Sequence, residues 1–296
     1  MNAATWPPTE ARRATEESLH FGAVLDGLCC GDGACFAAEV PEAWAQGRAV
    51  YGGLLAALGY RAARRLIGAD ERGPEAPPER AARAVLTSFI GPVAPGRVEV
   101  ETRLLRSGRA VTQVLATLSQ EGDALALVQV VFGAARESAA LVAGPPRPPA
   151  PAPESVPPLP FVAGLTPAFT RFFDYRPTQG RLPFTGAAEA LLGGHFRLRD
   201  VGASLDAVEL ALALGDAWPA PVLPLLRRPA PASSLTWSLE LVAPPAGAER
   251  PDPAGYWFFE ARADASAEGY AQEGARLWRP DGSLAAASRQ LVAVFG

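Results

Sequence analysis

A proline-rich segment divides the chain near its middle. Residues 143–160 read AGPPRPPAPAPESVPPLP, and proline at this density removes backbone donors and fixes the dihedral angle φ. We therefore expect neither a helix nor a central strand here, but an extended, semi-rigid linker. The linker separates residues 1–142 from residues 161–296, and two parts of similar length indicate an internal repeat.

Both parts show the same order of local patterns. Each has one strongly apolar helical stretch, over residues 51–67 and 204–215, with Ser204 as the expected N-cap of the second. Alternating apolar runs follow, and turn signals at residues 121–123 and 281–283 predict hairpins. The fold class predicted is α+β, with each half an antiparallel sheet wrapped around a central helix.

The composition excludes several classes of function. The net charge of -4 gives no basic surplus for nucleic acid, and no apolar run reaches the roughly 18 residues that a membrane span needs. The N-terminal residues lack a secretory signal pattern. Cys29, Cys30 and Cys35 fit reduced thiols in a strand-like segment better than a disulfide framework or a zinc site. We therefore expect a cytoplasmic protein that binds neither nucleic acid nor membrane.

The common catalytic motifs are absent from the sequence. There is no GxSxG, HExxH, CxxC or GxGxxG, so neither a metal nor a cofactor is predicted. The chain has no lysine, which excludes Schiff-base chemistry. The two histidines, His20 and His195, lie in strand-like segments, where a structural role is more common than that of a base.

Six segments, in order, resemble the double-hotdog acyl-CoA thioesterases of the acyl-CoA thioesterase II type. They are RAVYGGLLAALGYRAA (48–63), TSFIGPVAPG (87–96), GGHFRLRD (193–200), ALGDAWPAP (213–221), SSLTWSLEL (233–241) and DGSLAAASRQLVAVF (281–295). The resemblance implies a tandem hotdog, with residues 1–142 as the N-terminal unit, 143–160 as the linker and 161–296 as the C-terminal unit. It also implies hydrolysis of an acyl-CoA substrate without a cofactor.

The resemblance further implies a catalytic trio in the second half. The family's aspartate falls on Asp216, its hydroxyl on Ser234, where many members carry threonine, and its glutamine on Gln290. The first half offers Gln129 or Val130 at the place of Gln290, so one site per chain is implied.

The trio suits thioester hydrolysis, which needs a water, a group that orients or deprotonates it, and a donor to the developing oxyanion. Asp216 could act as the base or fix the water, and Gln290 can only orient because it does not titrate. The backbone amides of Gly52 and Gly53, at the start of the first helix, could polarise the thioester carbonyl. The CoA phosphates would need cations, for which the candidates are Arg61, Arg64, Arg65 and Arg83.

Other interpretations remain open at this point. Asp216 could be only a polar helix terminus, Ser234 could share a polar strand face with Thr236 and Ser238, and Gln290 could be a paired core residue. Two other functions compete with the thioesterase. One is a hotdog hydratase or dehydratase, which would need a histidine, and the other is a non-catalytic acyl-ligand-binding protein. Two fused hotdogs already mimic the usual dimer, so assembly into a homo-oligomer would be a separate event.

Overall fold

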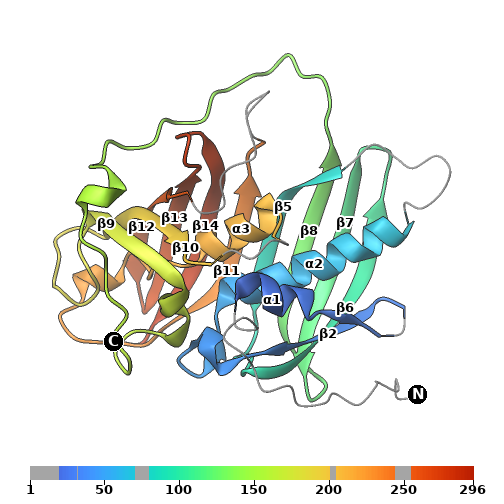
Figure 1. Ribbon diagram of the computed structural model, residues 1–296, viewed down its shortest axis with the longest axis horizontal. Helices are drawn as coiled ribbons and strands as arrows, with labels where there is room; N and C mark the ends of the chain where they lie inside the picture. Colours follow the sequence, from blue (N-terminus) through green and yellow to red (C-terminus); the bar gives the residue numbers. More distant parts are fainter. Residues whose placement is uncertain (1–19, 32, 71–79, 201–204, 244–254) are drawn as a thin grey trace.

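The computed structural model describes residues 20–31, 33–70, 80–200, 205–243 and 255–296. Its main feature is a 12-stranded antiparallel sheet in the order β1-β2-β6-β7-β8-β5-β11-β14-β13-β12-β10-β9 (Figure 1). The strands of the first part are β1 (Cys29–Cys30), β2 (Cys35–Val40), β5 (Arg80–Phe89), β6 (Gly96–Ser107), β7 (Val111–Gln120) and β8 (Asp123–Ala134). Those of the second part are β9 (Phe173–Gly180), β10 (Leu191–Leu198), β11 (Ala232–Leu241), β12 (Trp257–Ala267), β13 (Tyr270–Trp278) and β14 (Leu284–Val294).

The remaining elements are short, apart from two helices. A small hairpin of β3 (Ala45–Gln46) and β4 (Ala49–Val50) lies outside the main sheet. The α-helices are α1 (Phe21–Asp26), α2 (Gly52–Asp70) and α3 (Ala207–Gly215). The 3-10 helices are η2 (Glu42–Trp44), η3 (Pro153–Ser155), η4 (Ala168–Phe172) and η5 (Leu223–Leu225).

The two parts of the chain share one sheet. Strand β5 of the first part pairs with β11 of the second, with residues 84–88 opposite residues 236–240. Helix α2 packs on β6, β7 and β8, and α3 packs on β11, β13 and β14. Both helices contribute fully buried leucines such as Leu54, Leu58 and Leu212, each worth roughly 1.5–3 kcal/mol of burial free energy.

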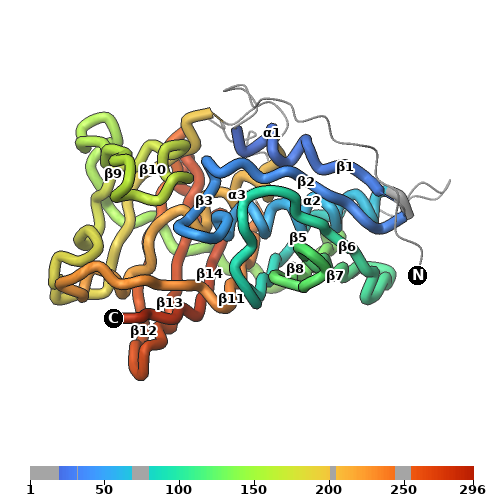
Figure 2. The backbone as a smooth tube through the Cα atoms, turned by 90° about the horizontal axis from the view of Figure 1, so that it is seen from below, coloured from blue at the N-terminus to red at the C-terminus, as the bar shows by residue number. Residues whose placement is uncertain are grey.

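The helices α2 and α3 lie side by side (Figure 2). They run antiparallel, because Gly52 at the start of α2 lies against Asp216 at the end of α3, and Arg61 further along α2 contacts Glu209 near the start of α3. Near the start of α3, the guanidinium of Arg61 binds the carboxylate of Glu209 through Nε–Oε1 (2.6 Å) and Nη2–Oε2 (2.8 Å), and Asp26 through Nη1–Oδ1 (2.6 Å). Glu209 is 1% exposed and Arg61 is 9% exposed. Desolvating both charges is costly, so the bidentate geometry is needed to offset that cost.

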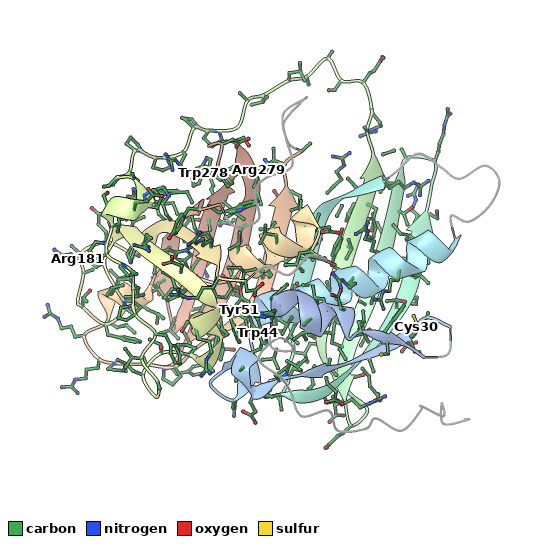
Figure 3. The ribbon with its side chains drawn as sticks, viewed as in Figure 1. Cys30, Trp44, Tyr51, Arg181, Trp278 and Arg279 are labelled. Atoms are coloured by element: carbon green, nitrogen blue, oxygen red, sulfur yellow. The ribbon has the colours of Figure 1, made fainter. Side chains whose placement is uncertain are left out.

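Aromatic rings add a second contact between the parts. Trp44 stacks on Phe172 with centroids 4.4 Å apart, and Tyr51 stacks on Phe169 at 4.2 Å. Tyr51 and Trp44 come from the first part of the chain and lie at its border with the second (Figure 3). Such offset or stacked pairs contribute about 0.5–1.5 kcal/mol beyond their area.

The linker is extended but not free. It arches from β8 towards β9 (Figure 1) and is bound to the second part. The indole of Trp278, which lies below this arch (Figure 3), donates to the Pro145 carbonyl at 2.9 Å, and Arg176 donates to the Val156 carbonyl at 2.8 Å. His195 Nε2 lies 3.0 Å from the Pro151 carbonyl. Prolines lack a backbone N–H group, so most of these contacts use linker carbonyls, but the Leu159 N–H also donates to the Tyr175 carbonyl at 2.9 Å.

The hairpin turns, the cysteines and the N-cap of the second helix were predicted from the sequence and can be compared with the structure. The hairpin turns and the three cysteines lie where predicted, and Cys29, Cys30 and Cys35, in β1 and β2, form no disulfide among the described residues. The expected N-cap Ser204 lies outside the described residues. Helix α3 is capped by Asp206, which forms a capping box with Glu209.

The expectation for His20 was wrong. It does not lie in a strand but is the N-cap residue of α1, with extended backbone (φ -67, ψ 150). The segment FGAVLD that follows it forms a helix of only six residues, with Gly27 as its C-cap, which is too short for a periodicity signal.

We expect Glu209→Gln to lower the free energy of unfolding by about 3 kcal/mol, because Arg61 would keep a buried charge without its bidentate partner. Urea unfolding measures this. The matched control is Arg289→Gln, which removes the ion pair to Asp264 between two exposed side chains and should cost less than about 1 kcal/mol. Equal losses in the two variants would contradict the structural role of the Arg61–Glu209 pair.

Candidate active site

The three polar residues predicted for the second half meet at the end of α3. Asp216 is the C-cap residue of this helix. The side-chain amide of Gln290 donates from Nε2 to Asp216 Oδ1 at 3.2 Å and to Ser234 Oγ at 2.5 Å. Because one amide nitrogen serves both oxygens, Gln290 fixes the carboxylate and the hydroxyl relative to each other.

A β-bulge places Ser234 on the correct face of the sheet. Between β11 and β14, Ser234 pairs with Val292 and Trp237 pairs with Gln290, and the register shifts between Ser234 and Thr236. The extra residue turns Ser234 to the face of Trp237 and Gln290, away from the exposed Thr236. Ser234 therefore does not belong to the polar outer face that the simple alternation allowed.

The first half contributes the beginning of α2. The backbone N–H of Gly53 donates to the Asp216 carboxylate. A Cβ atom on Gly52 would lie 2.6 Å from Asp216 Oδ2 and 2.9 Å from Phe89 Cζ. Glycine is thus required for this close approach, and the positive end of the α2 dipole faces a carboxylate.

Two tyrosines hold the end of α3 in place. The hydroxyl of Tyr51 donates to the Ala213 carbonyl at 2.6 Å, and that of Tyr175 donates to the Ala217 carbonyl at 2.8 Å. These bonds satisfy carbonyls that a helix C-terminus otherwise leaves without partners. The position of Asp216 is therefore fixed from both sides.

Burial makes Asp216 an unusually basic carboxylate. It raises the pKa of this carboxyl to about 7, against the opposing effect of the hydrogen bonds from Gln290 and Gly53. A carboxylate with a pKa near neutral pH can accept a proton from water more readily than an ordinary aspartate can.

Sequence reasoning missed a second carboxyl group, that of Glu273. It lies directly opposite Gln290 in the β13–β14 ladder and is 3% exposed. Asp216, Glu273 and Gln290 line one cavity of about 20 Å³, which has room for one water molecule. The available signal was an acidic residue at an inward position of β13, between the apolar Ala271 and Ala275.

The other candidates lie elsewhere. His195 pairs with Phe258 in the β10–β12 ladder and faces the linker, whereas the neighbouring Phe259 lines the cavity. It is thus on the opposite face of the sheet from Asp216. All four candidate arginines donate to protein groups: Arg61 to Glu209 and Asp26, Arg64 to Asp206, Arg65 to the Leu28 carbonyl and Arg83 to the Gly133 carbonyl.

Within the described parts of the chain, no group of three or more histidine, cysteine, aspartate or glutamate side chains could hold a metal ion. None of the helices there has the length and apolar character that crossing a membrane requires.

Comparison with known proteins supplies two family matches. Residues 40–133 match the family model described as the acyl-CoA thioesterase N-terminal domain, and residues 153–294 match the acyl-CoA thioesterase C-terminal domain. No curated protein matches the chain.

Solved structures match nearly the whole chain. A hot dog fold protein of unknown function from Alicyclobacillus acidocaldarius is 25% identical with a TM-score of 0.76, covering 94% of this chain and 98% of its own. A proposed thioesterase II from Thermobifida fusca is 24% identical with a TM-score of 0.74, covering 93% and 97%. Acyl-CoA thioesterase II TesB2 from Mycobacterium marinum is 18% identical with a TM-score of 0.69, covering 93% and 98%. At these identities the last two show similarity of fold.

We expect Gly52→Ala to destabilise the protein by about 1–3 kcal/mol, because the new methyl group would overlap Asp216 and Phe89. The matched control is Gly68→Ala near the other end of α2, where a Cβ meets no atom within 4 Å. This substitution should raise the free energy of unfolding by about 0.5 kcal/mol. Thermal unfolding of both variants measures the difference. A stabilised Gly52→Ala variant would contradict the close approach.

Proposed function

The chain belongs to the acyl-CoA thioesterase family of tandem hotdog proteins, and from this premise we propose that it hydrolyses acyl-CoA thioesters to a carboxylic acid and coenzyme A. The observation that carries the proposal is the hydrogen-bonded group of Asp216, Gln290 and Ser234 at the start of α2. We also infer that α2 and α3 are the central helices of the two hotdog units, since each packs on the strands of its own half.

The reaction begins with a water molecule held beside Asp216. The carboxylate accepts a proton from this water while the water oxygen attacks the thioester carbonyl carbon. The carbon–sulfur bond then breaks, and the departing thiolate takes the proton from Asp216. The products are the free acid and the thiol of coenzyme A, and the enzyme returns to its starting state.

The remaining groups orient the reactants. Gln290 donates to both oxygens, so the Ser234 hydroxyl keeps its own proton for a hydrogen bond to the water or the substrate. Of the two glycine amides, that of Gly53 donates to Asp216 and keeps the base in place. We assign the Gly52 amide, at the positive end of α2, as the donor to the developing oxyanion.

The position of His195 argues against a hydratase. It faces the linker on the opposite side of the sheet and would not reach a substrate bound beside Asp216.

Asp216→Asn removes the base but keeps the size of the side chain. We expect kcat to fall by at least about 100-fold on acyl-CoA substrates, as is typical for loss of a general base. Release of free thiol measures the rate. The control is Asp264→Asn, which alters an exposed carboxylate of β12 and should leave the rate unchanged. Equal rates in wild type and Asp216→Asn would contradict the role of Asp216. Tight acyl-CoA binding without thiol release from wild type would instead indicate a binding protein.

The pH dependence offers a separate test. Asp216 acts only as a carboxylate, so kcat/KM should rise about tenfold per pH unit on the acid side of its pKa, which is about 7. The residual activity of Asp216→Asn should lack this inflection. A wild-type profile that is already flat between about pH 5 and pH 7 would exclude Asp216 as the base.

A further inference from the structure

Glu273 has a buried carboxyl group, and one of its two oxygens has no hydrogen-bond partner among the described residues. Its Oε1 accepts a long hydrogen bond of 3.4 Å from the Val222 N–H. Its Oε2 is buried and has no hydrogen-bond partner among the described residues. Buried polar atoms in folded proteins nearly always have a partner, so an oxygen of this kind indicates a bound molecule or a functional role.

Glu273 lines the same small cavity as the proposed base, Asp216. Asp216 reaches this cavity from the end of α3, Glu273 from β13 and Gln290 from β14. A water molecule in a buried site is typically held by about three polar partners. The cavity of about 20 Å³ provides these three side chains and room for one water.

We propose that Glu273 is a further catalytic residue, whose carboxyl group binds and orients the nucleophilic water across the cavity from Asp216. The inference rests on the proposed function, because it assigns the water that the hydrolysis consumes. In this arrangement the water accepts a hydrogen bond from the protonated Glu273 and donates one to the Asp216 carboxylate. Its second lone pair is left to attack the thioester carbonyl. Glu273 keeps its proton throughout, so the balance of the reaction is unchanged.

The surroundings of the cavity favour a neutral Glu273. Burial raises its pKa to about 8, and the nearby negative charge of Asp216 acts in the same direction. The hydroxyls of Tyr51 and Tyr175, near Asp216, stay protonated because burial raises their pKa as well. The charged side chains of the strands around Glu273 point to the opposite face of the sheet: Glu260, Arg262, Asp264, Arg276 and Arg289.

Two substitutions separate a water ligand from a structural carboxyl. Glu273→Gln keeps a donor, so kcat should stay within about fivefold of wild type. Glu273→Leu removes the polar group, so kcat should fall at least about 30-fold with KM nearly unchanged. Its melting temperature should not fall, because an incompletely bonded polar group is replaced by an apolar one. Glu240→Gln, at an exposed position of β11, is the control. A wild-type kcat in Glu273→Leu would overturn the proposal.

The pH profile gives a readout that a structural role would not move. Ionisation of Glu273 removes its donor, so wild-type kcat should fall above about pH 8. Glu273→Gln should lack this alkaline limb. If the fall in kcat above about pH 8 persisted in Glu273→Gln, the proposal would be overturned, even if Glu273→Leu failed to fold.

Infrared spectroscopy separates failure of this inference from failure of the proposed function. Between about pH 6 and pH 9 the wild-type protein should lose a protonated-carboxyl band that is absent in Glu273→Gln. If wild type releases no thiol from any acyl-CoA but shows this band, the proposed function fails and the neutral carboxyl stands. If the wild-type protein releases thiol and the band is unchanged in Glu273→Gln, the inference about Glu273 fails while the proposed function stands.

Discussion

The antiparallel contact between α2 and α3 determines where the polar groups of the site lie. At the start of α3, Arg61 and Glu209 join the helices through a buried bidentate ion pair. At its end, Asp216 meets the first amides of α2. The C-terminal carbonyls of α3 and the N-terminal amides of α2 carry opposite partial charges, so this arrangement is electrostatically favourable. A shift between the helices would break the ion pair and the Gly53–Asp216 hydrogen bond together.

The two halves of the chain contribute different groups to the candidate site, although their folds are similar. Asp216, Ser234 and Gln290 all come from the second half, and the first half supplies a helix N-terminus. In β8 of the first half, Gln129 faces outward and bonds Gln113, while the inward Val130 is fully buried. At the position where the second half has the hydrogen-bonded Gln290, the first half thus has an apolar core residue. The pairing of β5 with β11 keeps the two halves in one sheet.

Local signals in the sequence were sufficient for much of the fold, but not for the whole site. The helix predicted over 51–67, which the structure shows as α2 (Gly52–Asp70), follows from its strongly apolar composition, and the hairpins follow from apolar alternation and turn signals. These are properties of single segments. The bulge after Ser234 depends on its register with β14, which no single segment encodes. The alignment of Glu273 with Gln290 likewise requires two paired strands. His20 was misassigned because a six-residue helix is shorter than a reliable pattern.

The choice of hydrogen-bond donors explains why Asp216 can be held firmly and remain basic. Asp174 provides the contrast within the same protein. Burial acts to raise its pKa too, but hydrogen bonds from Arg176 and Tyr256 lower it below the ordinary value. Asp216 receives its hydrogen bonds from a side-chain amide and a backbone N–H, both neutral, and its pKa stays at about 7. A guanidinium at position 290 would orient the carboxylate equally well but would stabilise its charged form. Neutral donors therefore fix the geometry of the Asp216 carboxylate without removing its affinity for a proton.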